Sequence, residues 1–214
     1  MLDVPSFQQI AALAAACGLL IVVPGPSVLF IIGRALTQGR RVALGGVLGN
    51  AIGCAAAAVL VAAGLGVLLS RFDWLLLVLK YVGGAYLVWL GVRAYRRAGR
   101  EGAEATAEAA SVTGPQSIRS GAFVGMTNPK SYLIFAAVVP QFAAPGAGPL
   151  SVQLFLLSLV PIGIGLVTDS VWPLGAGRAR RALSGARAQR RAGKAGALCL
   201  VGLGSYVAVA PVGR

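Results

Sequence analysis

Three ionisable side chains lie inside long apolar runs of the sequence: Lys80, Lys130 and Asp169. A charge at the middle of a bilayer costs at least about 2.5–3.5 kcal/mol, so such groups usually face the protein interior. Lys80 lies near the start of its run, and its long side chain can reach the membrane surface. Lys130 and Asp169 are the candidates for chemistry. They could complement the carboxylate and ammonium groups of an amino acid, Asp169 could carry a coupling proton, or the two could form a structural salt bridge.

Two helix-breaking sites accompany these charges. Pro24, Gly25 and Pro26 interrupt the first apolar run, and Asn128 and Pro129 interrupt a later one in similar surroundings, VPGPSVLFIIG against TNPKSYLIFAA. Proline removes an amide hydrogen and clashes with the preceding turn, so each site predicts a broken helix. The freed backbone groups need protein or water around them within a membrane. A simple kink is one interpretation, and a transporter's binding site between paired broken helices is the other.

The second apolar run carries a different pattern. Gly45, Gly49 and Gly53 recur every four residues along one helical face, which predicts close packing against another helix. Asn50 lies beside that face and is the strongly polar side chain in the middle of the run. A buried amide needs a hydrogen-bond partner or water, so Asn50 is a further candidate site residue.

The elements that must position these residues are membrane helices. The chain has 214 residues, of which 57% are hydrophobic and only 12% charged. Soluble domains average about 25% charged residues, and this composition predicts an all-α polytopic membrane protein instead. We expect six spans, at residues 10–33, 42–70, 74–92, 120–139, 150–172 and 195–212.

The distribution of positive charge predicts how the spans are oriented. The net charge is +13, and fifteen arginine and lysine residues fall in alternate connections against two in the others and the termini. Such asymmetry places the loops 34–41, 93–119 and 173–194 in the cytoplasm and the N-terminus outside. The basic residues therefore indicate contact with anionic lipid headgroups rather than with nucleic acid.

The longest connection divides the chain into two halves. Residues 93–119 are polar and alanine-rich, which is typical of a cytoplasmic linker. Residues 1–92 and 120–214 then form one three-helix half each. Because each half has an odd number of spans, homologous halves would be inverted relative to one another.

Several classes of function do not fit the sequence. The chain has no histidine, and its cysteines, Cys17, Cys54 and Cys199, lie in apolar runs as small core residues. We therefore predict no enzyme, no metal site and no cofactor. No GxxxxGK[ST] loop is present, so transport would draw on a gradient. A non-transporting membrane scaffold or a passive channel is the alternative to a transporter, and the glycine face also permits a homo-oligomer.

Four segments together resemble one family. PGP at 24–26, GGVLGNAIG at 45–53, LKYVGGAYLVWLGVRAYR at 79–96 and GAFVGMTNPK at 121–130 are similar to the lysine exporter and homoserine/threonine resistance family of bacterial translocators. The resemblance implies a bacterial inner-membrane exporter of amino acids or related small metabolites, driven by the proton motive force. It also implies functional roles for the residues that match the family's motifs: Pro24, Gly25, Pro26, Asn128, Pro129 and Lys130. Asp169, in VTDSVW, lies in a segment similar to the family's fifth span.

The substrate follows only in part from the residues. Homoserine, threonine, leucine, lysine and other small amines or acids fit an exporter of this kind. Asp169 is the single acidic residue in any predicted span. With so little acidic character in the membrane, we expect a neutral zwitterion rather than a dibasic substrate. We interpret transport as alternating access, in which the two halves rock around a site near the broken helices.

Overall fold

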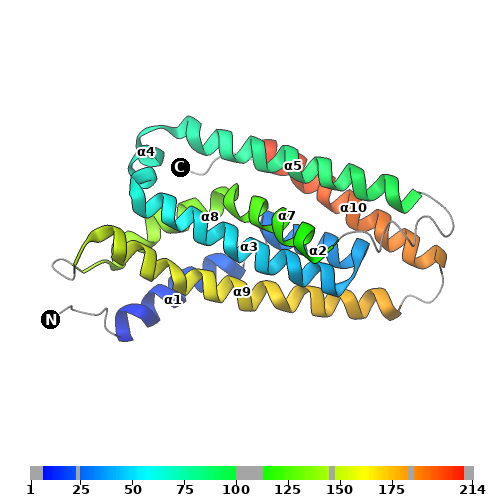
Figure 1. The fold of residues 1–214 in the computed structure, drawn as a ribbon, viewed down its shortest axis with the longest axis horizontal. Coiled ribbons are helices and arrows are strands. Elements are labelled where there is room, and N and C mark those ends of the chain that lie inside the picture. The colour runs from blue at the N-terminus through cyan, green and yellow to red at the C-terminus, as the bar shows by residue number, and fades with distance from the viewer. Residues whose placement is uncertain (1–6, 23–24, 100–112, 145–147, 183–185, 210–214) are drawn as a thin grey trace.

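A computed structural model describes residues 7–22, 25–99, 113–144, 148–182 and 186–209. These residues form helices and short connections, with no strand in the described part. The helices run roughly along one long axis (Figure 1). Their bounds are α1 Phe7–Val22, α2 Pro26–Gln38, α3 Arg40–Leu60, η1 Val61–Leu65, α4 Gly66–Arg71, α5 Asp73–Gly99, α7 Gly114–Met126, α8 Pro129–Leu133, η2 Ile134–Val138, η3 Val139–Phe142, α9 Leu150–Ala182 and α10 Ala186–Val209.

Both predicted helix breaks are confirmed. α1 and α2 meet at an angle of 55°, and α7 meets the segment from α8 to η3 at 50°. In each pair the proline is the first residue of the second helix, Pro26 in α2 and Pro129 in α8. The missing amide hydrogen costs nothing at that position, because the first amides of a helix have no partner within it.

The second predicted span is broken as well, which its apolar pattern did not indicate. α3 continues into η1, where Gly64 has φ of 109° before α4 begins. Side chains with a β-carbon rarely adopt this conformation, so Gly64 allows the chain to bend there. The continuous span expected over residues 42–70 is therefore wrong at its C-terminal end, beyond Gly64.

The predicted basic loops are shorter than expected. Within residues 34–41, only Gly39 separates α2 from α3, with φ of 91°. Most of residues 173–194 are helical, because α9 reaches Ala182 and α10 begins at Ala186. Alanine and arginine are strong helix formers, so both helices extend through the charged sequence. Residues 100–112 of the linker lie outside the described residues.

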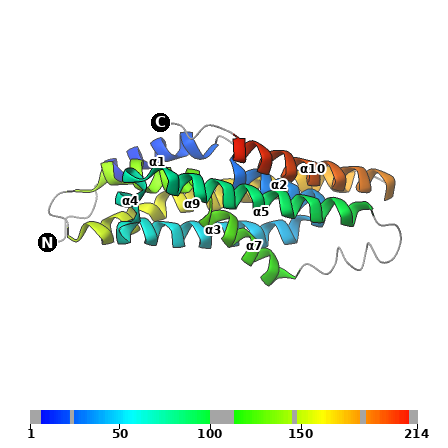
Figure 2. The same ribbon diagram turned by 90° about the horizontal axis from the view of Figure 1, so that it is seen from above.

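Helices from the two sequence halves interleave. α3 packs along α7, α5 packs along α10, and α2 contacts α3, α9 and α10. Figure 1 shows α5 and α10 together on one side of the bundle, and Figure 2 shows α1 on the opposite side from α7. Gly91 permits the contact between α5 and α10, because a β-carbon there would lie 2.8 Å from the carbonyl oxygen of Ala197. The division of the chain at residues 93–119 stays a prediction.

The number of membrane spans is set by length and composition. Among the described residues, two continuous segments are long and apolar enough to cross a membrane, Arg40–Leu65 and Leu150–Gly175. Each bent pair adds one more span if it crosses as a unit, which gives up to four. Large apolar side chains such as Leu156, Val167 and Leu198 are exposed on the outer surface, as a lipid-facing surface requires. The count of six spans stays a prediction.

Two apolar clusters lie on either side of the helix breaks. One joins Leu13 and Cys17 of α1 to Tyr132, Phe135 and neighbouring side chains of α3 and α9. The other joins Phe30 and Ile31 of α2 to residues of α3, α5, α7 and α10. Tyr132 and Phe135 of the first cluster come directly after the break at Pro129. Phe30 and Ile31 of the second cluster come directly after the break at Pro26. The breaks are thus enclosed between two blocks of packed apolar side chains.

Candidate functional site

A cavity of about 60 Å³ lies at the helix breaks, between α2, α3, α8 and α9. That space holds roughly four water molecules. Most of the site residues expected from sequence line it. They are Gly25, Asn50, Asn128, Lys130 and Asp169.

Asn50 and Asp169 form the polar wall of the cavity. Both side chains are almost fully buried, with 6% and 4% of their surface exposed. The Asn50 amide nitrogen donates a hydrogen bond of 3.0 Å to Asp169 Oδ2, which joins α3 to α9 across 119 residues of sequence. The amide oxygen of Asn50 has no hydrogen-bond partner in the described structure. A buried acceptor without a partner is unfavourable, so it requires an explanation such as a bound ligand or water.

Lys130 contributes a positive charge to the same cavity. Its side chain runs past Gly25, where a β-carbon would lie 3.4 Å from Lys130 Cδ and 3.8 Å from Nζ. Lys130 and Asp169 therefore bring opposite charges to one cavity, and these charges interact electrostatically. Gly25 leaves room for the lysine side chain because it has none of its own.

Asn128 joins the two breaks. Its side-chain oxygen accepts a hydrogen bond of 3.1 Å from the backbone amide of Lys130, which caps α8. Its side-chain nitrogen donates to Ser27 Oγ over 3.4 Å. The first turns of α2 and α8 are thus held together through one amide side chain.

The prolines have a different environment. Pro26 and Pro129 line a second, very small cavity on the other face of the breaks, together with Asn128 and residues of α5. Gly83 allows α5 to approach there, because a β-carbon would lie 3.1 Å from the carbonyl oxygen of Thr127. Pro24 lies outside the described residues, and so does the side chain of Lys80.

This arrangement suits recognition of a small polar molecule rather than covalent catalysis. A carboxylate, an ammonium group and amide and hydroxyl groups face one cavity whose remaining walls are apolar. These groups can pair with a ligand that carries both charges.

The family model for LysE-type translocators matches residues 19–210 of the chain. The chain belongs to this family.

Curated relatives of this LysE-type translocator include efflux proteins. It is 34% identical to the homoserine/homoserine lactone efflux protein of Salmonella typhimurium over 149 residues, 70% of this chain and 71% of the relative. It is 30% identical to the threonine efflux protein of Escherichia coli K12 over 133 residues, 58% and 62% of the two chains. A Vibrio cholerae membrane protein is 34% identical over 122 residues, 57% of this chain and 58% of that protein. No solved structure matches the chain.

Several polar residues of the translocator's cavity were not expected from sequence. Ser27, Cys54 and Ser131 line it, and Cys54 Sγ lies 3.4 Å from Ser131 Oγ. Cys54 was predicted to be a core residue, but it borders the cavity from α3. Serine and cysteine occur throughout apolar runs, so their types alone do not distinguish them. Ser27 and Ser131 each lie close to a helix-starting proline, Pro26 and Pro129, which is the signal that could have identified them.

Proposed function

We propose that this chain exports a neutral amino acid or a closely related small metabolite from the cytoplasm of a bacterium. The observation that carries the proposal is the presence of Lys130 and Asp169 in one cavity at the two helix breaks. Membership of the LysE-type family and the relatives named as efflux proteins support the direction of transport. The basic ends of the helices are proposed to face the cytoplasm, with the N-terminus outside.

The charges define how a zwitterion binds. Asp169 accepts hydrogen bonds from the ammonium group, and Lys130 pairs with the carboxylate. Asn50 holds the Asp169 carboxylate in position through its 3.0 Å hydrogen bond. A dibasic substrate would bring a second positive charge, and Asp169 is the only acidic residue among those that line the cavity.

The two apolar clusters on either side of the helix breaks are the proposed gates. In alternating access, one apolar block parts while the other stays closed, so the site faces one side of the membrane at a time. The cluster around Tyr132 and Phe135 is the proposed outer gate, and the cluster around Phe30 and Ile31 is the proposed inner gate. Two bent helix pairs of similar angle, 55° and 50°, support the interpretation of two inverted halves.

Export from labelled cells tests this function. Cells that produce the chain are loaded with a panel of labelled amino acids, including homoserine, threonine, leucine and lysine, and efflux is followed with and without a protonophore. We expect export of at least one neutral amino acid to stop when the protonophore collapses the proton gradient, since the chain has no nucleotide-binding loop to supply energy. Cells with an empty vector give the background.

Two results would contradict the proposal. If well-expressed protein changes no efflux across the panel, the chain is a scaffold or acts on other substrates. If efflux continues undiminished with the protonophore and stops only at equal concentrations, the chain is a passive channel.

The size of residue 25 provides a second test. A methyl group at Gly25 would make an ordinary contact with Lys130 Cδ, whereas the branches of valine extend further toward the lysine. We expect Gly25→Ala to keep export close to wild type and Gly25→Val to reduce it roughly tenfold, which corresponds to about 1.4 kcal/mol for displacing a charged contact. Initial efflux rates at matched expression measure the difference. Equal export by both variants would mean that the position of Lys130 does not matter.

A further inference from the structure

A third cavity, larger than the other two, lies near the ends of α2, α5, α7 and α10 that carry the basic residues. Its volume is about 240 Å³, and it is separate from the cavity at the helix breaks. Three arginines from three helices line it: Arg34 of α2, Arg93 of α5 and Arg119 of α7. The sequence placed Arg34 in a cytoplasmic loop, but the structure buries it within α2 with 6% of its surface exposed.

The lining of this arginine cavity matches an oxyanion. No acidic side chain occurs among the described residues that line it, whereas Thr37, Gln116 and Ser120 add neutral hydrogen-bonding groups. Guanidinium groups pair with phosphate through two parallel hydrogen bonds. The Arg34 guanidinium is oriented by Gln38, whose Oε1 accepts a hydrogen bond from Nη1, and lies 5.3 Å from the centre of the Phe30 ring. The deepest of the three arginines is therefore held in place before any ligand arrives.

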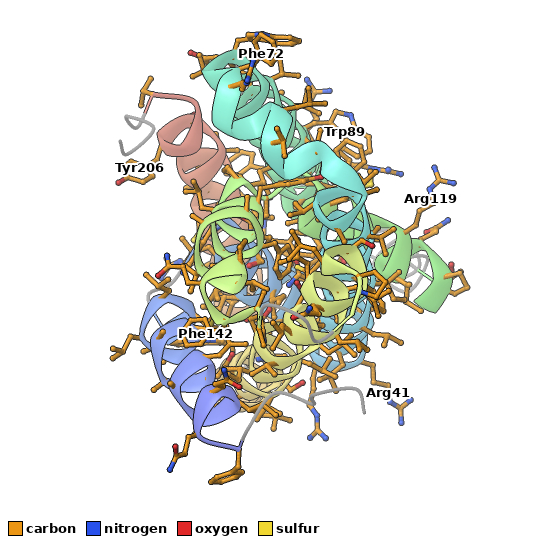
Figure 3. All side chains as sticks on the ribbon, turned by 90° about the vertical axis from the view of Figure 1, so that its left-hand side faces the viewer. Arg41, Phe72, Trp89, Arg119, Phe142 and Tyr206 are labelled. Atoms are coloured by element: carbon orange, nitrogen blue, oxygen red, sulfur yellow. The ribbon has the colours of Figure 1, made fainter. Side chains whose placement is uncertain are left out.

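The mouth of the cavity lies at a surface suited to lipid. Trp89 is 51% exposed there, and the Arg93 guanidinium lies 5.4 Å from the centre of its ring. Val92 and Tyr95 of the same helix are also exposed. Viewed down the long axis, Trp89 and Arg119 lie on the same flank of the bundle (Figure 3). An anion site whose mouth carries an exposed indole suits a phosphate headgroup at the membrane surface, where tryptophan rings favour the interface.

We propose that the arginine cavity binds the phosphate headgroup of an anionic phospholipid from the leaflet at this end of the bundle. Arg34 holds the phosphate from inside, and Arg93 and Arg119 close on it from the mouth. The site is distinct from the substrate cavity and does not depend on the proposed export. Bound lipid would tie α2, α5 and α7 together at this end.

Lipid binding to the purified full chain tests the proposal. Native mass spectrometry in detergent compares phosphatidylglycerol with phosphatidylcholine of the same acyl chains. We expect phosphatidylglycerol to be preferred, and the double variant R93Q/R119Q to bind it about tenfold more weakly. The matched control is R40Q/R41Q, which removes two exposed arginines from the start of α3 that do not line the cavity. We expect this control to stay within about twofold of wild type, because only diffuse charge is lost.

Each alternative gives a different result. An equal loss in both double variants would show attraction to diffuse positive charge and would overturn the site. Equal binding of the two lipids by wild type would overturn it as well. Inorganic phosphate is the third probe: if it stabilises the protein against heat in an arginine-dependent manner while phosphatidylglycerol adds nothing, the ligand is free phosphate and the lipid assignment is wrong. R119Q alone, at an exposed position, should show a smaller loss and provides the measurement if the double variant does not fold.

Discussion

Asp169→Asn is expected to reduce export strongly while the protein stays folded. Asparagine has nearly the shape of aspartate but brings no negative charge to the substrate's ammonium group and cannot carry a proton. A hydrogen bond to a charged group contributes about 1.5–3 kcal/mol, so we expect export to fall roughly 10–100-fold. Initial efflux rates of the best substrate, normalised to the amount of protein in the membrane, measure the loss. Asp73→Asn makes the same change at the first residue of α5 and should leave export unchanged.

Pairing this variant with Lys130→Met separates function from structure. If the two charges only stabilise one another, each single variant leaves one buried charge uncompensated, and the double variant should recover both stability and export. If they bind the substrate, the double variant should be stable and remain inactive. Full export by the double variant would overturn the proposed binding roles and establish a structural ion pair.

Gly53→Ala is expected to destabilise the protein by about 3 kcal/mol, at the upper end of the usual cost of overpacking. A β-carbon on Gly53 would lie 2.1 Å from the carbonyl oxygen of Ala122 and 2.7 Å from the amide nitrogen of Met126. Both atoms belong to the backbone, so no side chain can move aside, and α3 and α7 must separate. We expect the melting temperature in detergent to fall by roughly 6 °C or more.

The matched control is the same substitution where space is open. A β-carbon on Gly163, in the interior of α9, would meet no atom within 4 Å. Gly163→Ala should therefore leave stability unchanged or raise it by up to about 1 kcal/mol, because alanine favours a helix over glycine. Similar melting temperatures for the two variants would mean that α3 and α7 are not in close contact.

Local chemistry was sufficient to predict the helix breaks and the apolar character of the bundle. Proline has no amide hydrogen whatever its surroundings, which favoured helix starts or kinks at Pro26 and Pro129. The period of four between Gly45, Gly49 and Gly53 likewise predicted a face for close packing. These are properties of single residues and of helical spacing, which a sequence contains directly.

The partners of these residues were decided by the tertiary structure. The glycine face of α3 packs on α7, where β-carbons on Gly121 and Gly125 would also meet backbone atoms of α3. Asn50 was recognised as needing a partner, but only the packing of α3 beside α9 supplied Asp169. Cys54 was predicted to be a core residue, and Ser27 was not singled out, until the fold placed both at the cavity.

The burial of Arg34 was also decided by the tertiary structure. Its charge and its place near the end of an apolar run indicated a solvated loop, yet α2 continues past it and neighbouring helices bury it. The sequence by itself determined which residues break helices, which faces pack closely and which charged groups need an interaction partner within a membrane. Only the tertiary structure decided which of them meet, because contacts between α3 and α9 or between α2 and α5 depend on the packing of whole helices rather than on spacing along the chain.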